Sequence, residues 1–215
     1  MFFRKKKSSH HKNILLQEAF NHHQRGDIVA ASKAMEEVLH IDPVNSEALD
    51  YLGNAYFVRQ QLDEAKNMFE RLIKNKPEYA EAYHNLGSVS KKQGNMDEAK
   101  NLYKQALAIN PNLAEAYYNL GSISDVQGNL EEAKDAYMQA LNINPDFVEA
   151  YNNLGMIFYQ QHMLDEAVDV YKKALQIRPD AALIYNNLGL AYQAEGNSTE
   201  AYKAYKKSLE IIFIS

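Results

Sequence analysis

The chain has 215 residues and no cysteine, which excludes disulfides, thiolate metal sites and a cysteine nucleophile. Its net charge of −5 is uneven: Arg4, Lys5, Lys6, Lys7 and Lys12 give the first twelve residues +5, so the rest carries −10. Because affinity for nucleic acid comes largely from neutralised phosphates, such an acidic body predicts no nucleic-acid partner. Apolar runs such as 211–214 are far shorter than the roughly 20 residues of a membrane span.

The first eleven residues are expected to form a basic, flexible tail. The basic stretch leads into Ser8-Ser9 rather than an apolar core, so no signal peptide is predicted and the expected location is cytoplasmic. Phe2 and Phe3 beside the basic residues allow a second hypothesis, a weak peripheral contact with an anionic membrane. The simpler interpretation is a solvated chain end.

Prolines mark a period of 34 residues in the remaining sequence. All five fall at this spacing: Pro43, Pro77, Pro111, Pro145 and Pro179. Aligning on them gives six units: 12–45, 46–79, 80–113, 114–147, 148–181 and 182–215. Each of the nine glycines falls at one of two places in a unit, so the period governs the whole chain beyond the tail.

Each unit is predicted to form two helices. In unit 80–113, apolar and small residues recur at helical spacing before and after Gly94-Asn95. Gly94 fits a helix end, and Asn95 with Glu98 is predicted to form a capping box for the next helix. The pairs Asn129–Glu132 and Asn197–Glu200 repeat the device. Proline is expected at the entry to the following helix. Without strand alternation anywhere, the predicted fold class is all-α.

Small residues predict how the helices meet. A glycine follows leucine in the first helix of five units, and leaves room for a close crossing: Gly53, Gly87, Gly121, Gly155 and Gly189. Large aromatics of the second helices are expected to fill the remaining volume: Phe69, Tyr103, Tyr137, Tyr171 and Tyr205. Because one unit cannot bury this surface alone, the units are expected to stack into one core.

The recurring combination of Tyr, Leu-Gly, an aromatic, Ala and Pro resembles the tetratricopeptide repeat (TPR) family over residues 12–215. The resemblance implies a solenoid of six helix-turn-helix repeats in a right-handed superhelix, whose first helices line a concave groove for peptides or partner helices. Glu18-Ala19 replaces Leu-Gly in the first unit and Phe213 replaces proline in the last, so the terminal units look divergent.

The resemblance places a partner-binding groove on first-helix side chains that the core does not use. The candidates are Asn54, Glu81, Asn85, Glu115, Tyr118, Asn119, Glu149, Asn152, Asn153, Asn186 and Asn187. An asparagine amide both donates and accepts, so the column Asn85, Asn119, Asn153, Asn187 could pair with the backbone of an extended peptide. The column is similar to the TPR region of O-linked N-acetylglucosamine transferase. The alternative is that these amides only pack between neighbouring first helices.

The expected ligand is a protein or peptide segment, neutral or basic. Some TPR co-chaperones bind a C-terminal carboxylate with basic residues, but the corresponding places here hold Asp50, His84, Tyr118 and acids, which would repel a carboxylate. The leading hypothesis is therefore a non-enzymatic scaffold or adaptor. The alternative is the substrate-recognition region of a larger or multi-chain enzyme, such as a glycosyltransferase.

No catalytic residue, metal site or cofactor is predicted. The adjacent histidine pairs His10-His11 and His22-His23 point in different directions on a helix, and no His-x-x-x-His or His-Glu-x-x-His spacing occurs. Carboxylates recur with the 34-residue period at helix starts, where they interact favourably with the helix dipole. Every glycine is explained by the repeat, which leaves no phosphate-binding loop.

The C-terminal end predicts an association surface. Without proline, the last helix can continue, and no following helix covers its apolar face. Exposed apolar patches often mark contacts. Self-association or partner docking is therefore expected through Tyr205, Leu209, Ile212 and Phe213; the alternative is a monomer whose tail folds back over the last repeat.

Overall fold

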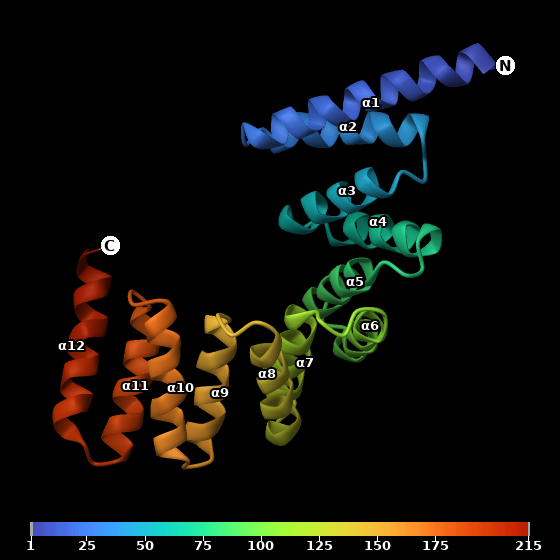
Figure 1. Ribbon diagram of the computed structural model, residues 1–215. Helices are drawn as coiled ribbons and strands as arrows, with labels where there is room; N and C mark the ends of the chain where they lie inside the picture. Colours follow the sequence, from blue (N-terminus) through green and yellow to red (C-terminus); the bar gives the residue numbers. More distant parts are fainter. Residues whose placement is uncertain (1, 215) are drawn as a thin grey trace. The chain divides into compact units, whose positions relative to one another are not determined.

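The computed structural model describes residues 2–214, and the side chains of residues 9–213. This part of the chain forms twelve α-helices and no strand (Figure 1), which confirms the all-α prediction. The helices are α1 (Phe2–Gln24), α2 (Ile28–Ile41), α3 (Ser46–Val58), α4 (Leu62–Asn75), α5 (Ala80–Lys92), α6 (Met96–Ile109), α7 (Ala114–Val126), α8 (Leu130–Ile143), α9 (Val148–Gln160), α10 (Leu164–Ile177), α11 (Ala182–Ala194) and α12 (Ser198–Ile214).

The helices form six consecutive pairs, each joined by a short turn. Three pairs, α1 to α6, belong to a compact unit spanning Met1–Pro111, and three, α7 to α12, to a second unit spanning Asn112–Ser215. Within the first unit α2 packs on α3 and α4 on α5; within the second, α8 packs on α9 and α10 on α11. Within each unit, a pair therefore buries its surface against the next pair, which is the stacking expected of a repeat protein.

The first helix is longer than the sequence analysis expected. It begins at Phe2, so the backbone of residues 2–11 is helical where a flexible tail was predicted. Residues 2–24 contain neither glycine nor proline, and the charged residues there have good helix propensity, so nothing stops the helix from extending. The side chains of Phe2, Phe3 and the basic residues up to Lys7 lie outside the described residues.

The close glycine crossings confirm the packing prediction. A Cβ atom added at Gly155 would lie 2.5 Å from the Tyr171 ring, and one at Gly53 would lie 2.6 Å from the Phe69 ring. Tyr171 and Phe69 are each only 1% exposed. The second-helix aromatic ring therefore occupies the space that a first-helix side chain would otherwise fill.

The predicted capping boxes form only in part. Asn95 and Asn129 are the N-caps of α6 and α8, but neither side chain makes a capping hydrogen bond. The Met96 N–H bonds instead to the Gly94 carbonyl at 3.0 Å, and the exposed Asn95 amide can bond to water. Asn197 does accept a bond from the Glu200 N–H, at 3.3 Å. The prolines also lie earlier than predicted, in the turns: Pro77 precedes the N-cap Tyr79 by two residues.

The turn inside each pair requires a left-handed residue. Four repeats have a glycine here with φ between 75° and 86°: Gly26, Gly94, Gly128 and Gly196. The two repeats without this glycine use Gln60 (φ 62°) and His162 (φ 58°). A side chain in this conformation costs about 1 kcal/mol. We therefore expect Gln60→Gly and His162→Gly each to raise the free energy of unfolding by up to about 1 kcal/mol.

Chemical denaturation of the two variants measures this effect. The control is Gly128→Ala, where an added Cβ would have no atom within 4 Å, so only backbone strain changes. It should be destabilised by a similar amount. If Gly128→Ala is as stable as the unsubstituted protein, left-handed strain does not limit stability at this turn.

Candidate functional site

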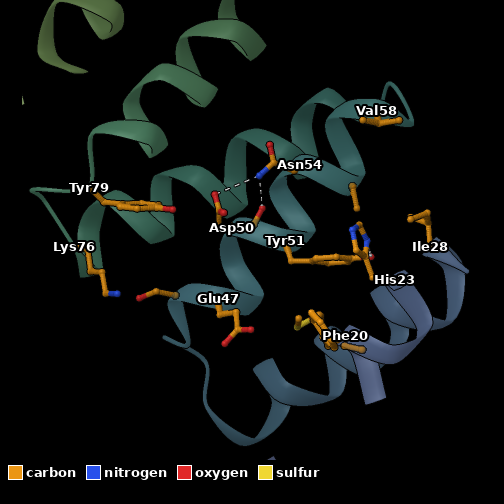
Figure 2. Close-up of a pocket in the computed structure, with 14 residues that line it drawn as sticks. Phe20, His23, Ile28, Glu47, Asp50, Tyr51, Asn54, Val58, Lys76 and Tyr79 are labelled. Atoms are coloured by element: carbon orange, nitrogen blue, oxygen red, sulfur yellow. Dashed lines mark hydrogen bonds between the residues drawn. The ribbon is translucent and has the colours of Figure 1, made fainter. Parts of the chain in front are cut away.

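A cavity of about 620 Å³ lies in the first unit (Figure 2). Its walls come from α1, α2 and α3, and from the turn that precedes α5. A smaller adjoining cavity of about 360 Å³ shares Phe20 and Glu47 with it. The two cavities together are thus longer than a single side chain, and they lie where the first helices of two neighbouring repeats meet.

One end of the cavity is apolar. Phe20 and Val58 are 55% and 77% exposed, and Ile28 of α2 stands beside them (Figure 2). The buried Met35 lies beneath. Exposed aliphatic and aromatic side chains that gather in a concavity are typical of a contact site, because covering them removes apolar surface from water.

Two aromatic rings form the middle of the cavity. The His23 ring of α1 meets the Tyr51 ring of α3 edge to face, with centroids 5.6 Å apart. The Tyr51 hydroxyl lies 3.4 Å from His23 Nδ1. Because the pair joins α1 to α3, it fixes the spacing of the two first helices that border the cavity.

The other end is polar and acidic. Asp50 Oδ1 accepts a hydrogen bond from Asn54 Nδ2 at 3.3 Å. Burial raises the pKa of Asp50 despite this bond, and the negative charge of Glu81 raises it further. Within the described residues Asp50 forms no ion pair. Its charge is therefore poorly compensated by the protein itself.

Tyr79 closes the acidic end. Its hydroxyl points toward Asp50 in Figure 2, and its pKa is raised by burial and then by the charges of Asp50 and Glu81. Lys76 and Glu47 also border this end. The cavity thus combines an apolar end with an end where a cation from outside would be stabilised.

The asparagine column pairs across neighbouring first helices. In the first unit, Asn85 Nδ2 lies 3.4 Å from Asn54 Oδ1. In the second unit, Asn187 donates to Asn152 Oδ1 at 2.8 Å. These contacts link one repeat to the next. They favour the alternative interpretation, in which the amides pack between neighbouring first helices.

Asn153 is engaged by three neighbouring side chains. Its amide donates to the hydroxyls of Tyr118 (3.3 Å) and Tyr137 (3.2 Å), and its oxygen accepts from Asn152. Asn119, on α7, also has a partner. Asn186, on α11, is exposed. The amide of Asn153 would have to release the two tyrosine hydroxyls before it could donate to a ligand.

The predicted acidic positions lie in the first turns of their helices. Glu81, Glu115 and Glu149 begin α5, α7 and α9, and all three are exposed. Glu149 forms an ion pair with Arg178 at 2.9 Å. Of the three, Glu81 lies closest to the cavity, since its charge acts on both Asp50 and Tyr79.

The C-terminal surface is only partly as predicted. Leu209, Ile212 and Phe213 of α12 are 54%, 56% and 83% exposed. Tyr205 instead packs on Gly189 and donates its hydroxyl to Gln193 at 2.8 Å, because it occupies the core place of its repeat. Tyr202, 69% exposed, belongs to the outward-facing set instead.

Sequence reasoning missed most of the cavity. Phe20, His23, Val58, Lys76 and Tyr79 were not proposed as site residues. One signal was available: Phe20 occupies the repeat position that holds Asn54, Ser88 and Ser122 in the next three units. The last two repeats carry Met156 and Leu190 there, so the large aromatic ring of Phe20 departs from the small polar residues of the second, third and fourth repeats only.

The described residues contain no group of three or more His, Cys, Asp or Glu arranged to hold a metal ion. None of the helices in the same region has both the length and the apolar character needed to cross a membrane.

Comparison with known proteins supports the repeat assignment. Models of the tetratricopeptide repeat match residues 45–112, 78–146, 136–169 and 182–213, and a model of the TPR repeat matches residues 155–196. The search of curated proteins finds no match.

Three similar solved structures have the same fold. MamA is 28% identical, with a TM-score of 0.67, covering 77% of this chain and 91% of MamA. PilW, described as a widely conserved type IV pilus biogenesis factor, is 25% identical, with a TM-score of 0.77 and 90% coverage of both chains. YrrB, described as a TPR protein with an unusual peptide-binding site, is 21% identical, with a TM-score of 0.67, covering 84% of this chain and 93% of YrrB. The repeat models that match from residue 45 to residue 213 show that the chain belongs to the tetratricopeptide repeat family.

Proposed function

We propose that this protein is a non-enzymatic interaction scaffold that holds a peptide or a partner helix against the first helices of its repeats. The cavity between α1 and α3 is the observation that carries the proposal, because it leaves Phe20 and Val58 exposed beside an acidic end. Grooves of this kind receive extended or helical segments through apolar anchors. The peptide-binding site described for YrrB, which has the same fold, is consistent with this use.

The ligand segment is proposed to be neutral or basic. Glu81 and Glu115 are exposed acids in the first turns of α5 and α7, and Asp50 adds a poorly compensated charge near Glu81. Opposite charges steer an encounter and like charges oppose it. The exposed Asn186 is kept as a candidate hydrogen-bonding position on α11.

A partner isolated by pull-down from the native cell, and identified by mass spectrometry, allows the proposal to be tested. Glu81→Arg and Glu115→Arg should each slow its association several-fold at low salt, and high salt should remove the difference. The matched controls are Glu70→Arg on α4 and Asp135→Arg on α8, which make the same charge change at exposed second-helix positions. If the controls slow association as much as the first-helix variants, the first helices are not the contact face.

The alternative function is substrate recognition for an enzyme, such as a glycosyltransferase. The likeness of the asparagine column to the TPR region of O-linked N-acetylglucosamine transferase is the feature that favours it. The sequence that follows Ser215 in the full gene distinguishes the two functions, because a catalytic domain there would make this chain its recognition region.

Self-association and a cytoplasmic location stay predictions. Exposed Leu209 and Phe213 on α12 support the former. Sedimentation of the intact chain and of the Ile212→Lys, Phe213→Glu double variant tests it: the same monomer at high concentration in both would contradict the prediction. Binding of anionic vesicles by the intact chain tests the weak membrane contact proposed for its basic N-terminal residues.

A further inference from the structure

The cavity between α1 and α3 is lined by both apolar and acidic side chains. It combines the exposed Phe20 and Val58, and it places them away from Asp50 (Figure 2). At the positions equivalent to Phe20, the next three repeats carry Asn54, Ser88 and Ser122, and the last two carry Met156 and Leu190. The two ends therefore select for a ligand that carries two different groups side by side.

The apolar end fits a large aliphatic or aromatic side chain. Phe20, Ile28 and Val58 surround it, and covering them would remove exposed apolar surface from water. The two first helices are already held apart by the contact of His23 with Tyr51. A side chain can thus enter without separating α1 from α3.

The acidic end fits a cation. Asp50 is half-buried, its side-chain partner among the described residues is the neutral Asn54 amide, and Glu81 adds a second negative charge nearby. A partly desolvated carboxylate with these neighbours gains more from an ammonium or guanidinium group than an exposed carboxylate does. Lys76 borders the same end but forms no ion pair with Asp50 among the described residues.

We infer that this cavity binds a segment of a partner protein in which a large apolar side chain lies next to a lysine or arginine. The apolar side chain seats against Phe20 and Val58, and the cation reaches Asp50. A chain segment is the occupant rather than a free amine, because the adjoining cavity extends the hollow past Phe20 and Glu47. The inference rests on the proposed function and assigns it a site and a ligand chemistry.

Selection from a random peptide library displayed on phage, against the immobilised full chain, tests the inference. Enriched peptides should carry lysine or arginine beside an apolar residue. Synthetic copies should bind about tenfold more weakly to Asp50→Asn and to Val58→Asp. The control is Asp125→Asn on α7, another partly buried aspartate whose pKa burial raises, and it should bind like the unsubstituted protein.

Folding of the variants is checked by thermal melting. Asp50→Asn removes a half-buried charge and keeps the shape of the side chain, and Val58 is exposed, so both variants should fold. Because Asp50→Asn removes the charge and keeps the shape of the side chain, this variant separates an effect of charge on binding from an effect of structure. Loss of binding together with an unchanged melting transition assigns the effect to the contact.

The outcomes separate this inference from the proposed function. Peptides that bind Asp50→Asn and Val58→Asp undiminished, but lose affinity on Glu115→Arg, would overturn the inference and leave the scaffold function standing. A selection that enriches no peptide would count against both. If Nα-acetyl-lysine amide alone binds as tightly as the selected peptides, the site takes a small amine, and the peptide assignment is wrong.

Discussion

Replacing Tyr171 by alanine should lower the free energy of unfolding by about 4 kcal/mol, among the largest effects of any single substitution in the chain. The ring is 1% exposed and belongs to a buried cluster with Val148, Ile184 and Leu188 from the helices on either side. Removing the ring leaves a cavity between neighbouring helix pairs, and the closely packed side chains around it cannot move far enough to fill it. Chemical denaturation followed by circular dichroism measures the loss.

Two further substitutions show that packing is the cause. Tyr171→Phe should change stability little, because Phe69 already fills the same repeat position in the second repeat, 46–79. Tyr205→Ala should cost about 1 kcal/mol, since the ring of Tyr205 is partly exposed and its removal leaves a smaller enclosed cavity. An equal loss for Tyr171→Ala and Tyr205→Ala would contradict the view that burial between repeats sets the effect.

The sequence predicted the features of the fold that depend on position within the repeat. Glycine and an aromatic residue recur sixteen residues apart in five units, and the structure brings each such pair together, as with Gly155 and Tyr171. Both residues belong to one helix pair joined by a short turn, so the period alone is enough to place them. The same holds for the left-handed turn positions that glycine occupies.

Features that depend on a particular side-chain conformation could not be predicted. The pattern placed Asn153 on the first-helix face, but only the packing of α7, α8 and α9 shows that its amide reaches the hydroxyls of Tyr118 and Tyr137. Asn95 and Asn197 have the same capping sequence, yet only Asn197 makes the hydrogen bond. Amides on an exposed turn can bond to water at little cost in free energy, so the motif alone does not determine whether the capping hydrogen bond forms.

The candidate cavity was hard to predict for a third reason. Its residues come from positions that vary between the repeats, such as those of Phe20 and Val58, and an interpretation based on the period treats such variation as divergence. The sequence shows Asp50 as an acid in place of a basic clamp residue, and the structure adds that it is half-buried beside the neutral Asn54 amide. Function in a repeat protein is carried by such departures, because the repeated positions are occupied by packing.

Gly155→Ala should lower the free energy of unfolding by about 2 kcal/mol, even though alanine has the better helix propensity by about 1 kcal/mol. The added Cβ would lie 2.5 Å from the Tyr171 ring, which is enclosed and cannot move aside. Gly189→Ala is the matched control: its Cβ would also lie 2.5 Å from a ring, that of Tyr205, but this ring is partly exposed and can shift toward solvent.

The first repeat shows how the same crossing accepts a methyl group. Ala19 stands at the glycine position there, and the second helix presents the flexible Met35 instead of a ring; both belong to one buried cluster. A thioether chain can bend around a Cβ where a planar ring cannot. We therefore expect Gly189→Ala to be nearly neutral and Gly155→Ala to be clearly destabilised in the same denaturation experiment. Equal effects at the two positions would mean that the ring of Tyr171 yields as easily as that of Tyr205, and that enclosure by the neighbouring repeat does not hold it in place.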